Sequence, residues 1–204
     1  MYGLFSKVYV MLYSTTYASL VGPLTLAGDG ENLVGLWMEG DRYFADTIAG
    51  RPVTENKELP LFATVKNWLD AYFAGERPAI SALPLAPAGT PFQKLVYDIM
   101  RDIPYGQCTT YGAIARQAAR MMNKKRMSGQ AVGGAVGRNP ISIIIPCHRV
   151  VGANGNLTGY GGGIPKKIQL LRHEGVDMSA LFIPARARPS KTGRGRPTAS
   201  FSPS

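Results

Sequence analysis

Apolar residues in the first part of the chain follow two successive spacings. Three short runs rich in β-forming residues occupy residues 13–17, 23–27 and 33–38, and Asp29-Gly30 supplies a turn between the last two. From residue 60 to residue 73, apolar side chains recur every three or four positions. This pattern predicts an antiparallel sheet with one packed helix, and we find no reactive group in it.

The second part of the chain is predicted to be mostly helical. Four prolines in residues 78–91 indicate a linker. Directly after it, Thr90-Pro91-Phe92-Gln93 combines an N-cap, a first-turn proline and a capping-box glutamine, so a helix should begin there. Further helices are expected at 111–120, at 128–137 and at 165–174. The second and third of these four, joined by a turn and with Gly and Ala along the later one, are typical of a helix-turn-helix arrangement.

Length and composition suit two small domains. With 204 residues and 45% hydrophobic content, the chain can form an α/β domain at 11–85 and a second domain at 86–180. We expect an N-terminal extension at 1–10 and a basic, disordered tail at 181–204. The net charge is +10, and the basic residues from Arg186 onward contribute five of these charges, so a polyanion is the expected partner.

Several classes of protein are excluded by what the sequence lacks. No apolar run has the length of a membrane span, and the N-terminus does not resemble a secretory signal, so we expect a cytoplasmic monomer without a membrane contact. Only Cys108 and Cys147 are present, which is too few for a disulfide scaffold. Neither cysteine has the clustered Cys/His spacing of a zinc site, and we therefore predict no metal.

Residues 141–151 contain the candidate nucleophile. Three consecutive isoleucines at 143–145 predict a short strand that is buried on both faces. Pro146 cannot donate to a strand ladder, so the strand should end there and leave Cys147 at an edge or pocket mouth. The adjacent His148 is the kind of neighbour that lowers a thiol pKa, although a free cysteine can also be an inert core residue. Cys108 has no adjacent base, and we interpret it as structural.

The surroundings of Cys147 resemble a known family. Pro-Cys-His-Arg-Val at 146–150 is preceded by Gln-Ala-Val-Gly-Gly-Ala-Val-Gly-Arg-Asn-Pro at 130–140 and followed by Gly-Tyr-Gly-Gly-Gly at 159–163. Together with Leu-Leu-Arg-His-Glu-Gly at 170–175, these stretches are similar to the C-terminal domain of the 6-O-alkylguanine-DNA alkyltransferases. The resemblance covers residues 90–175 and extends more weakly to Met11.

This resemblance implies both a fold and an activity. The fold would be α/β (α+β), with a ribonuclease-H-like sheet-and-helix domain followed by a winged-helix-like, mostly helical domain. The activity would be DNA repair by irreversible transfer of the alkyl group of 6-O-alkylguanine to Cys147, one turnover per molecule. No cofactor is implied. The partner would be double-stranded DNA, bound through its minor groove without sequence preference.

Catalytic roles also follow from the resemblance. His148 would assist formation of the Cys147 thiolate through a water, and Glu174 would orient that imidazole. Glu174 is predicted in the last turn of a helix, where an acid is unfavourable against the helix dipole, so a partner would explain it. Tyr111 would donate a proton to the leaving guanine, and Asn139 would help hold the site. His173 is the rival imidazole, which helix-end electrostatics explain adequately.

The remaining expected roles concern DNA and the alkyl pocket. The residues predicted to contact DNA are Thr110, Gln130, Ala131, Gly133, Gly134 and Arg138. The residues predicted to line the pocket are Val136, Ser142, Tyr160 and Gly161. Gln130 departs from the family, which has an arginine there to fill the gap left by the extruded base. Gln130 can still hydrogen-bond the orphaned cytosine, but it lacks the charge and the stacking plane of arginine.

Two other functions fit parts of the pattern. A non-catalytic protein of the same fold could bind alkylguanine and flag it for another pathway, but such relatives replace the cysteine. A cysteine hydrolase could use Cys147, His148 and Glu174, although hydrolases usually bring Cys and His from separated stretches and have no need of a helix-turn-helix.

Overall fold

The structure is a computed structural model, and it describes residues 11–183. The predicted extension at 1–10 and the greater part of the predicted basic tail lie outside the described residues. Within 11–183, no helix is both long enough and apolar enough to cross a membrane.

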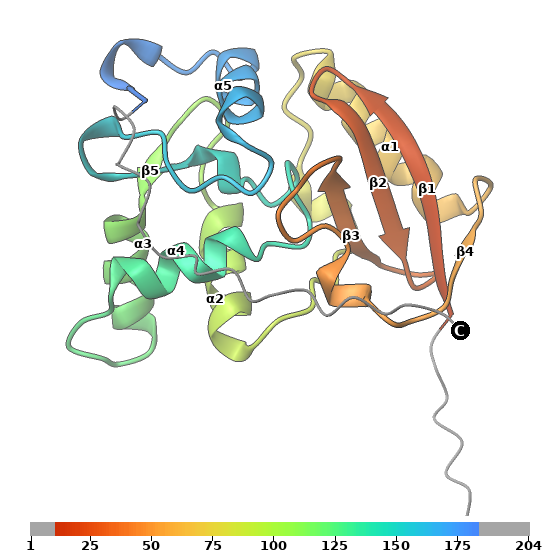
Figure 1. Ribbon diagram of the computed structural model, residues 1–204, viewed down its shortest axis with the longest axis horizontal. Coiled ribbons are helices and arrows are strands. Elements are labelled where there is room, and N and C mark those ends of the chain that lie inside the picture. Colours follow the sequence, from red (N-terminus) through yellow and green to blue (C-terminus); the bar gives the residue numbers. More distant parts are fainter. Residues whose placement is uncertain (1–10, 184–204) are drawn as a thin grey trace, which may run out of the picture.

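The N-terminal part is a four-stranded sheet with one helix packed on it. Its strands are β1 (Leu12–Ser19), β2 (Gly22–Gly28), β3 (Leu33–Met38) and β4 (Val53–Glu55), in the order β3-β2-β1-β4. The first three strands pair antiparallel, as predicted, whereas the unpredicted β4 pairs parallel to β1 at the edge. Helix α1 (Pro60–Phe73) covers one face of this sheet (Figure 1) and buries Phe62, Val65 and Leu69 among other residues.

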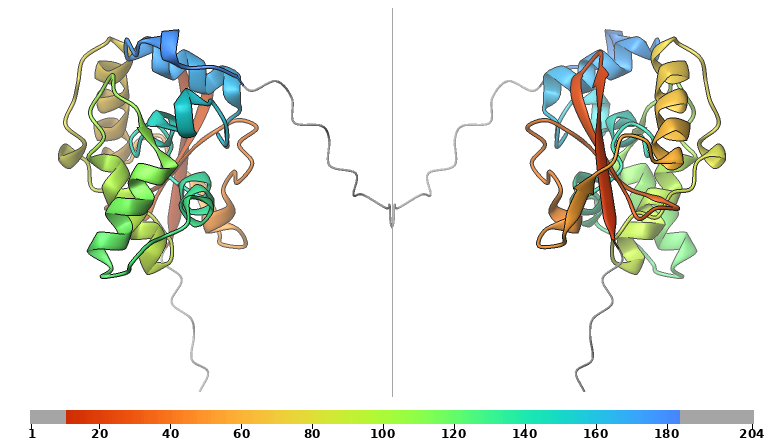
Figure 2. Two further views of the ribbon diagram at one scale, coloured as in Figure 1. Left: turned by 90° about the vertical axis from the view of Figure 1, so that its left-hand side faces the viewer. Right: turned by 90° about the vertical axis from the view of Figure 1, so that its right-hand side faces the viewer.

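The C-terminal part contains four helices, which lie beside the sheet in Figure 1 and are seen from two sides in Figure 2. These are α2 (Pro91–Arg101), α3 (Tyr111–Met121), α4 (Gly129–Gly137) and α5 (Ile164–His173). Each begins near the predicted position because of a local signal, which is a side-chain cap for α2, α3 and α4 and a first-turn proline for α5. Thr90 and Gln93 form the predicted capping box of α2, and the Ser128 hydroxyl accepts from two backbone N–H groups of α4.

Short elements complete the two parts and the segment between them. A two-stranded parallel ladder joins β5 (Thr109–Thr110) to β6 (Val150–Val151). The single-turn 3-10 helices are η1 (Asp46–Ile48), η2 (Ile80–Ala82), η3 (Cys147–Arg149), η4 (Ala153–Gly155) and η5 (Met178–Ala180). Because η3 directly follows Pro146 and precedes β6, it fixes Cys147 and His148 between two ordered segments.

The predicted strand at residues 141–145 is wrong. Ile141 makes an isolated bridge to Leu36, and the next residues form a tight turn in which Ile143 has φ 70°. A β-branched residue rarely takes that conformation, so the surroundings must hold it there. The Asn139 side chain does so, because its Nδ2 donates to the carbonyls of Ile141 and Ile145 and its Oδ1 accepts from Ile141 N. The isoleucines are buried as predicted, but in a turn.

The free edge of β3 connects the two parts. Leu36 N donates to Pro140 O and Ser142 N donates to Leu36 O, each at 2.8 Å. Further along the same edge, Leu33 bonds residues 84 and 86 of the proline-rich segment, so this predicted linker is packed against the sheet. One cluster of buried apolar side chains runs from β2 and α1 into α2, α4 and the isoleucine turn. The segment that carries Cys147 is therefore anchored on the N-terminal sheet.

Candidate active site

Cys147 is a free, buried thiol at the start of η3. Its exposure is 7%. Burial raises the pKa of Cys147, while the nearby Asn139 side chain lowers it, Asp41 raises it and Lys167 lowers it. The protein in this state therefore holds the residue mainly as a thiol at neutral pH, and a base is needed to activate it.

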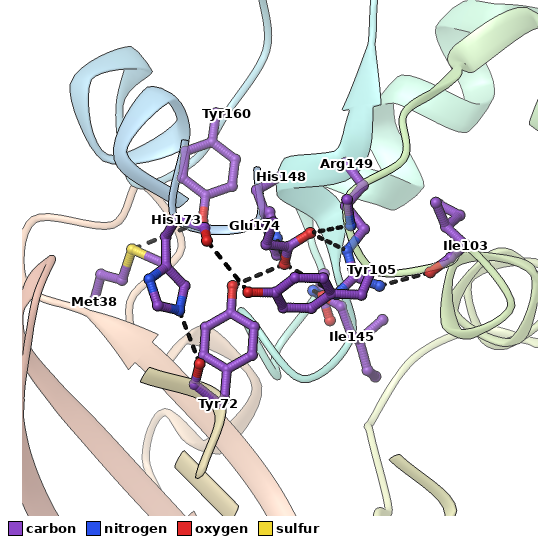
Figure 3. A network of polar contacts seen from close by, with 12 residues as sticks. Met38, Tyr72, Ile103, Tyr105, Ile145, His148, Arg149, Tyr160, His173 and Glu174 are labelled. Carbon is purple, nitrogen blue, oxygen red and sulfur yellow. Dashed lines mark hydrogen bonds and ion pairs between the residues drawn. The ribbon is translucent and has the colours of Figure 1, made fainter. Parts of the chain in front are cut away.

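His148 is the adjacent base, and its ring is completely buried. Its Nε2 lies 2.7 Å from Glu174 Oε1, which brings together two residues that are 26 positions apart (Figure 3). Burial lowers the pKa of His148 against the opposing effect of Glu174, so the imidazole is neutral at pH 7. Because ionised Glu174 can only accept, we assign the ring proton to Nε2, which leaves Nδ1 as a lone-pair acceptor. Within the described residues, Nδ1 is buried without a hydrogen-bond partner.

Glu174 is the C-cap of α5, and it receives more donors than the sequence suggested. Arg149 Nε and Nη2 donate to its two oxygens at 2.8 and 2.9 Å, and Tyr72 Oη donates to Oε1 at 2.8 Å. Gly106 N also donates to Oε2 at 3.2 Å. Burial by itself would raise the pKa of Glu174, but the bonds from His148 and Arg149 outweigh it and hold that pKa well below its usual range.

Arg149 and Tyr72 are the site residues that sequence reasoning missed. Arg149 is 5% exposed, and its Nη1 also donates to Ile103 O at 2.6 Å, which ties the site to the end of α2 (Figure 3). The unfavourable position of Glu174 at a helix C-terminus did signal a partner. Nothing local identified the partner as a tyrosine 102 residues away.

The rival imidazole His173 bonds Tyr72 and does not reach Glu174 through its ring. Its Nε2 lies 2.8 Å from Tyr72 O, and its ring packs against Tyr72 and Phe73 of α1 (Figure 3). Cys108 is only partly buried, packs with Val151 and Leu171, and has its pKa raised mainly by burial. Neither residue borders the hollow at Cys147.

The hollow at Cys147 is small. Its volume is about 10 Å³, and its walls are Asp41, Val136, Gly137, Asn139, Ser142, Cys147, Gly159, Tyr160, Gly161 and Gly162. All four predicted pocket residues are therefore brought to the thiol. A space of this size holds about one water molecule and cannot admit a purine base. A larger hollow of about 710 Å³ is lined by Arg149 and Tyr105 among others, and it does not border either cysteine.

Tyr111, at the first position of α3, lies against the loop that covers the hollow. Its hydroxyl is 3.2 Å from Thr158 O and 3.4 Å from Gly159 O, and it can donate to one of them at a time. Burial raises the pKa of Tyr111 to about 12, with a smaller contribution from Cys147. Tyr111 is therefore a protonated donor at neutral pH.

Helix α4 presents its small residues to solvent. Gln130, Ala131 and Gly134 are exposed and Gly133 is partly exposed. A Cβ added at Gly134 would meet nothing within 4 Å, and at Gly133 it would make only ordinary contact with Tyr111 at 3.9 Å. Packing within the protein thus does not require the glycine at 134.

The two other predicted DNA contacts are otherwise engaged. Thr110 caps α3, and its Oγ1 accepts from Ala113 N at 3.1 Å. The guanidinium of Arg138 lies 3.4 Å from Asp46 and stacks over Tyr43 at 4.7 Å, so it is directed toward the N-terminal part. Residues 11–183 contain no group of three or more His, Cys, Asp or Glu side chains placed to hold a metal ion.

The buried histidine should make stability depend on pH below neutrality. The folded pKa of His148 lies below the unfolded value of about 6.5, so the unfolded chain takes up a proton first as the pH falls. We expect the free energy of unfolding to fall more steeply between pH 6.5 and 5 in the wild type than in His148→Asn. The extra slope is at most about 1.4 kcal/mol per pH unit.

Urea denaturation at half-unit pH steps measures this slope. His173→Asn is measured alongside, because His173 is the other histidine of the chain. Parallel curves for the wild type and His148→Asn would contradict the assignment of a neutral, buried His148.

Comparisons with known proteins agree with this geometry. Residues 12–87 match the family model described as "6-O-methylguanine DNA methyltransferase, ribonuclease-like domain", and residues 91–176 match the one described as "6-O-methylguanine DNA methyltransferase, DNA binding domain". The methylated-DNA–protein-cysteine methyltransferase of Haemophilus influenzae is 43% identical over 166 residues, which are 81% of this chain and 87% of that one. The protein of the same name from Methanosarcina acetivorans is 44% identical over 165 residues, 80% and 99% of the two chains.

A solved structure shows the same arrangement. The crystal structure of Mycobacterium tuberculosis OGT in complex with DNA superposes with a TM-score of 0.70 at 41% identity, and it covers 80% of this chain and 93% of that one. The expected α/β sheet-and-helix part followed by a mostly helical part is thereby confirmed.

Proposed function

The chain belongs to the 6-O-methylguanine DNA methyltransferase family, and from that membership we infer that it repairs DNA by moving the alkyl group of 6-O-alkylguanine onto its own Cys147. The observation that supports the role of Cys147 is its position. Its buried thiol borders a closed hollow and adjoins His148, whose Nε2 is hydrogen-bonded to the ionised Glu174.

Activation of the thiol begins at His148. The neutral imidazole accepts the Cys147 proton at Nδ1 through a water molecule, and the bond from Nε2 to Glu174 stabilises the imidazolium that results. Arg149 and Tyr72 keep Glu174 ionised and fixed, because they occupy both of its oxygens. They are positioning residues for this step.

Transfer then moves one alkyl group and one proton. The Cys147 sulfur attacks the alkyl carbon, the S–C bond forms, and the bond from that carbon to O6 breaks with its electron pair going to guanine. Tyr111 supplies a proton to the guanine and recovers one from the imidazolium through solvent. The net change is thiol and alkylguanine to thioether and guanine. Every bond and proton comes from the substrate and the chain, so the reaction needs no cofactor, and a stable thioether ends the activity of that molecule.

DNA is bound by the α3-α4 pair, which we interpret as a helix-turn-helix arrangement in which α4 enters the minor groove without reading the sequence. The exposed small residues of α4 support this proposal, since they allow close approach to the floor of a groove. Thr110 and Gly133 would lie at the edge of this surface. Arg138 would reach DNA only by leaving Asp46 and Tyr43.

Extrusion of the damaged base must be supported by Gln130. It is exposed at the second position of α4, where Ser128 caps its backbone N–H at 3.1 Å. Its amide can hydrogen-bond the orphaned cytosine, but without the charge and stacking plane of the usual arginine we expect slower extrusion than in relatives with arginine there. The domain boundaries at 85 and 86, the monomeric state and the cytoplasmic location stay predictions.

Larger side chains at Gly134 should weaken DNA binding without preventing folding. Gly134→Ala is expected to stabilise the protein by about 0.5–1 kcal/mol, because the helical glycine gains a Cβ in open space. Gly134→Leu should also fold, yet weaken binding to a duplex by at least about tenfold, or 1.4 kcal/mol, by holding α4 off the DNA.

Thermal denaturation and fluorescence-anisotropy titration check the two halves of this prediction. Ala63→Leu, an exposed small-to-large change on α1, is the matched control and should bind DNA as the wild type does. Wild-type affinity in Gly134→Leu would show that α4 does not approach the duplex closely.

The proposed function is tested on a duplex whose restriction site contains one 6-O-methylguanine and resists cleavage. Incubation with an equimolar amount of protein should restore cutting, and it should do so once per molecule. Binding without restored cutting would favour the damage-recognition alternative. Neither binding nor restored cutting, together with hydrolysis of an ester probe, would favour the cysteine hydrolase.

A further inference from the structure

We propose that the end of β3 and the turn after it, residues 38–42, form a gate that shuts the Cys147 hollow in the protein without DNA, and that the Asp41 carboxylate keeps the thiol unreactive until an alkylated base displaces the gate. The proposal rests on the function proposed above. It adds to that function a part of the sheet domain that contains no nucleophile or base, and it assigns Asp41 as a gating residue that acts on Cys147.

The gate is fastened to the opposite wall at three places. Arg42 N donates to Gly161 O at 3.2 Å. The Tyr160 hydroxyl donates to Met38 Sδ at 3.7 Å (Figure 3), and Lys166 Nζ at the start of α5 donates to Glu39 O. The first two contacts join the N-terminal sheet to the glycine loop, residues 159–163, which forms one wall of the hollow, and the third joins it to α5.

Asp41 closes the remaining space between the gate and the glycine loop. Its Oδ1 accepts from Tyr43 N at 3.3 Å, which aims the carboxylate back toward the loop. A Cβ added at Gly161 would stand only 2.5 Å from that oxygen, so a glycine is required for the observed approach. With Asp41 in place the hollow holds about 10 Å³. A base therefore cannot enter until the loop and the gate separate.

Charge adds to this steric closure. The groups that face Cys147 are Asn139, Lys167 of α5, Asp41 of the gate, and the hydroxyls of Tyr97, Tyr111 and Tyr160. Of these, Asp41 is the carboxylate, and it raises the pKa of Cys147, whereas Lys167 and Asn139 lower it. Burial is the largest cause of the raised Cys147 pKa. Opening the gate exposes the thiol and moves the Asp41 carboxylate away from it, so both causes of the raised pKa are reduced together.

The consequence is a thiol that is protected at rest and activated by its substrate. A free thiolate in this protein would be spent irreversibly on any small electrophile, because the thioether is stable. Displacement of the gate by an entering base removes the acid from the thiol and makes room for the base in one movement. Thiolate formation is thereby coupled to occupancy of the pocket.

The test follows alkylation of Cys147 by iodoacetamide in the full chain without DNA, from pH 6 to 10. The labelled peptide is identified by mass spectrometry, so Cys108 is counted separately. Asp41→Asn keeps the side-chain size and the acceptor for Tyr43 N but removes the charge. We expect its labelling midpoint to fall by about one pH unit and its rate at pH 7 to rise about tenfold. Glu39→Gln removes an acid of the same turn that does not line the hollow, and it should label as the wild type does.

A second variant separates the steric part of the gate from its charge. Gly161→Ala should force Asp41 and the loop apart, so the labelling rate should rise several-fold even at pH 10, where the charge on sulfur no longer limits it. A wild-type pH profile in Asp41→Asn would overturn the role of the carboxylate. Wild-type rates in Gly161→Ala would overturn the closed gate.

Methyl transfer from a duplex under single-turnover conditions completes the test. Asp41→Asn should transfer at least as fast as the wild type, and slower transfer would mean that Asp41 assists the reaction, which contradicts the proposal. If the wild type itself gains no methyl group, the proposed function fails, while the iodoacetamide profiles still decide whether the gate exists.

Discussion

Replacing Glu174 with glutamine is expected to lower the free energy of unfolding by about 3–5 kcal/mol and to slow alkyl transfer by about a hundredfold. The reason is that both oxygens of the Glu174 carboxylate accept hydrogen bonds. Oε1 accepts from Tyr72, His148 and Arg149, and Oε2 accepts from Arg149 and Gly106. A glutamine must turn its NH₂ group toward one of these sets of donors. It also leaves the buried Arg149 charge without a counter-charge.

Chemical denaturation and single-turnover transfer measure the two effects. Glu55→Gln is the matched control, because Glu55 pairs with Lys57 on the exposed surface at 3.4 Å, and its loss should change neither quantity measurably. The folded pKa of Glu174 is depressed, so its contribution is present at neutral pH and is lost as the pH falls below the unfolded value of about 4.3. The stability gap between wild type and Glu174→Gln should therefore narrow below pH 4. A gap of less than 1 kcal/mol at pH 7 would contradict the proposed network.

Asn139→Ala is expected to cost about 3 kcal/mol of stability and to slow transfer at least tenfold. Its amide makes three bonds inside the isoleucine turn. Their loss leaves the buried Ile141 N–H without its side-chain acceptor, while the carbonyls of Ile141 and Ile145 keep only their backbone donors, Ile145 N and Cys147 N. The same change releases Ile143 from φ 70°, a conformation that only the surrounding bonds maintain. The turn leads directly into Pro146 and Cys147, so the thiol loses both its position and the hydrogen bond that favours its thiolate.

The control for this substitution is Asn56→Ala. Asn56 also holds a turn, with Oδ1 accepting from Glu58 N at 3.1 Å, but it does so on the exposed surface. Its loss should change stability by less than about 1 kcal/mol and leave transfer at the wild-type rate. If Asn139→Ala denatures at the same urea concentration as Asn56→Ala, the turn is held by something other than Asn139.

The helices were predictable because their signals are local. Thr90 and Ser128 cap α2 and α4 through side chains that lie within three residues of the groups they bind, and a 3.6-residue apolar spacing marked α1 over the observed range. The same locality explains why His148 could be named as the base, since it follows Cys147 directly.

The parts that could not be predicted depend on contacts between distant residues. The isoleucine run was interpreted as a strand because β-branched residues favour strands, but its bonds go to Leu36 of the sheet and to the Asn139 side chain. In the same way, Tyr72 reaches Glu174 across 102 residues, and Asp41 meets Gly161 from the other part of the chain. The sequence showed that Glu174 needed partners and could not show which they were.

The sheet domain therefore contributes to the active site although it contains no nucleophile. Its β3 edge anchors the isoleucine turn, its helix α1 supplies Tyr72, and its Asp41 lines the hollow at the thiol. Variants of this domain should be measured for transfer as well as for folding.

Intact-protein mass spectrometry shows whether Cys147 accepts the alkyl group. The wild type is mixed with an excess of duplex that contains one 6-O-methylguanine, next to Cys147→Ser and Cys108→Ser. We expect a gain of one methyl group per molecule that maps to Cys147, persists in Cys108→Ser and is absent in Cys147→Ser. An unchanged wild-type mass, or a methyl group that maps to Cys108, would contradict this expectation.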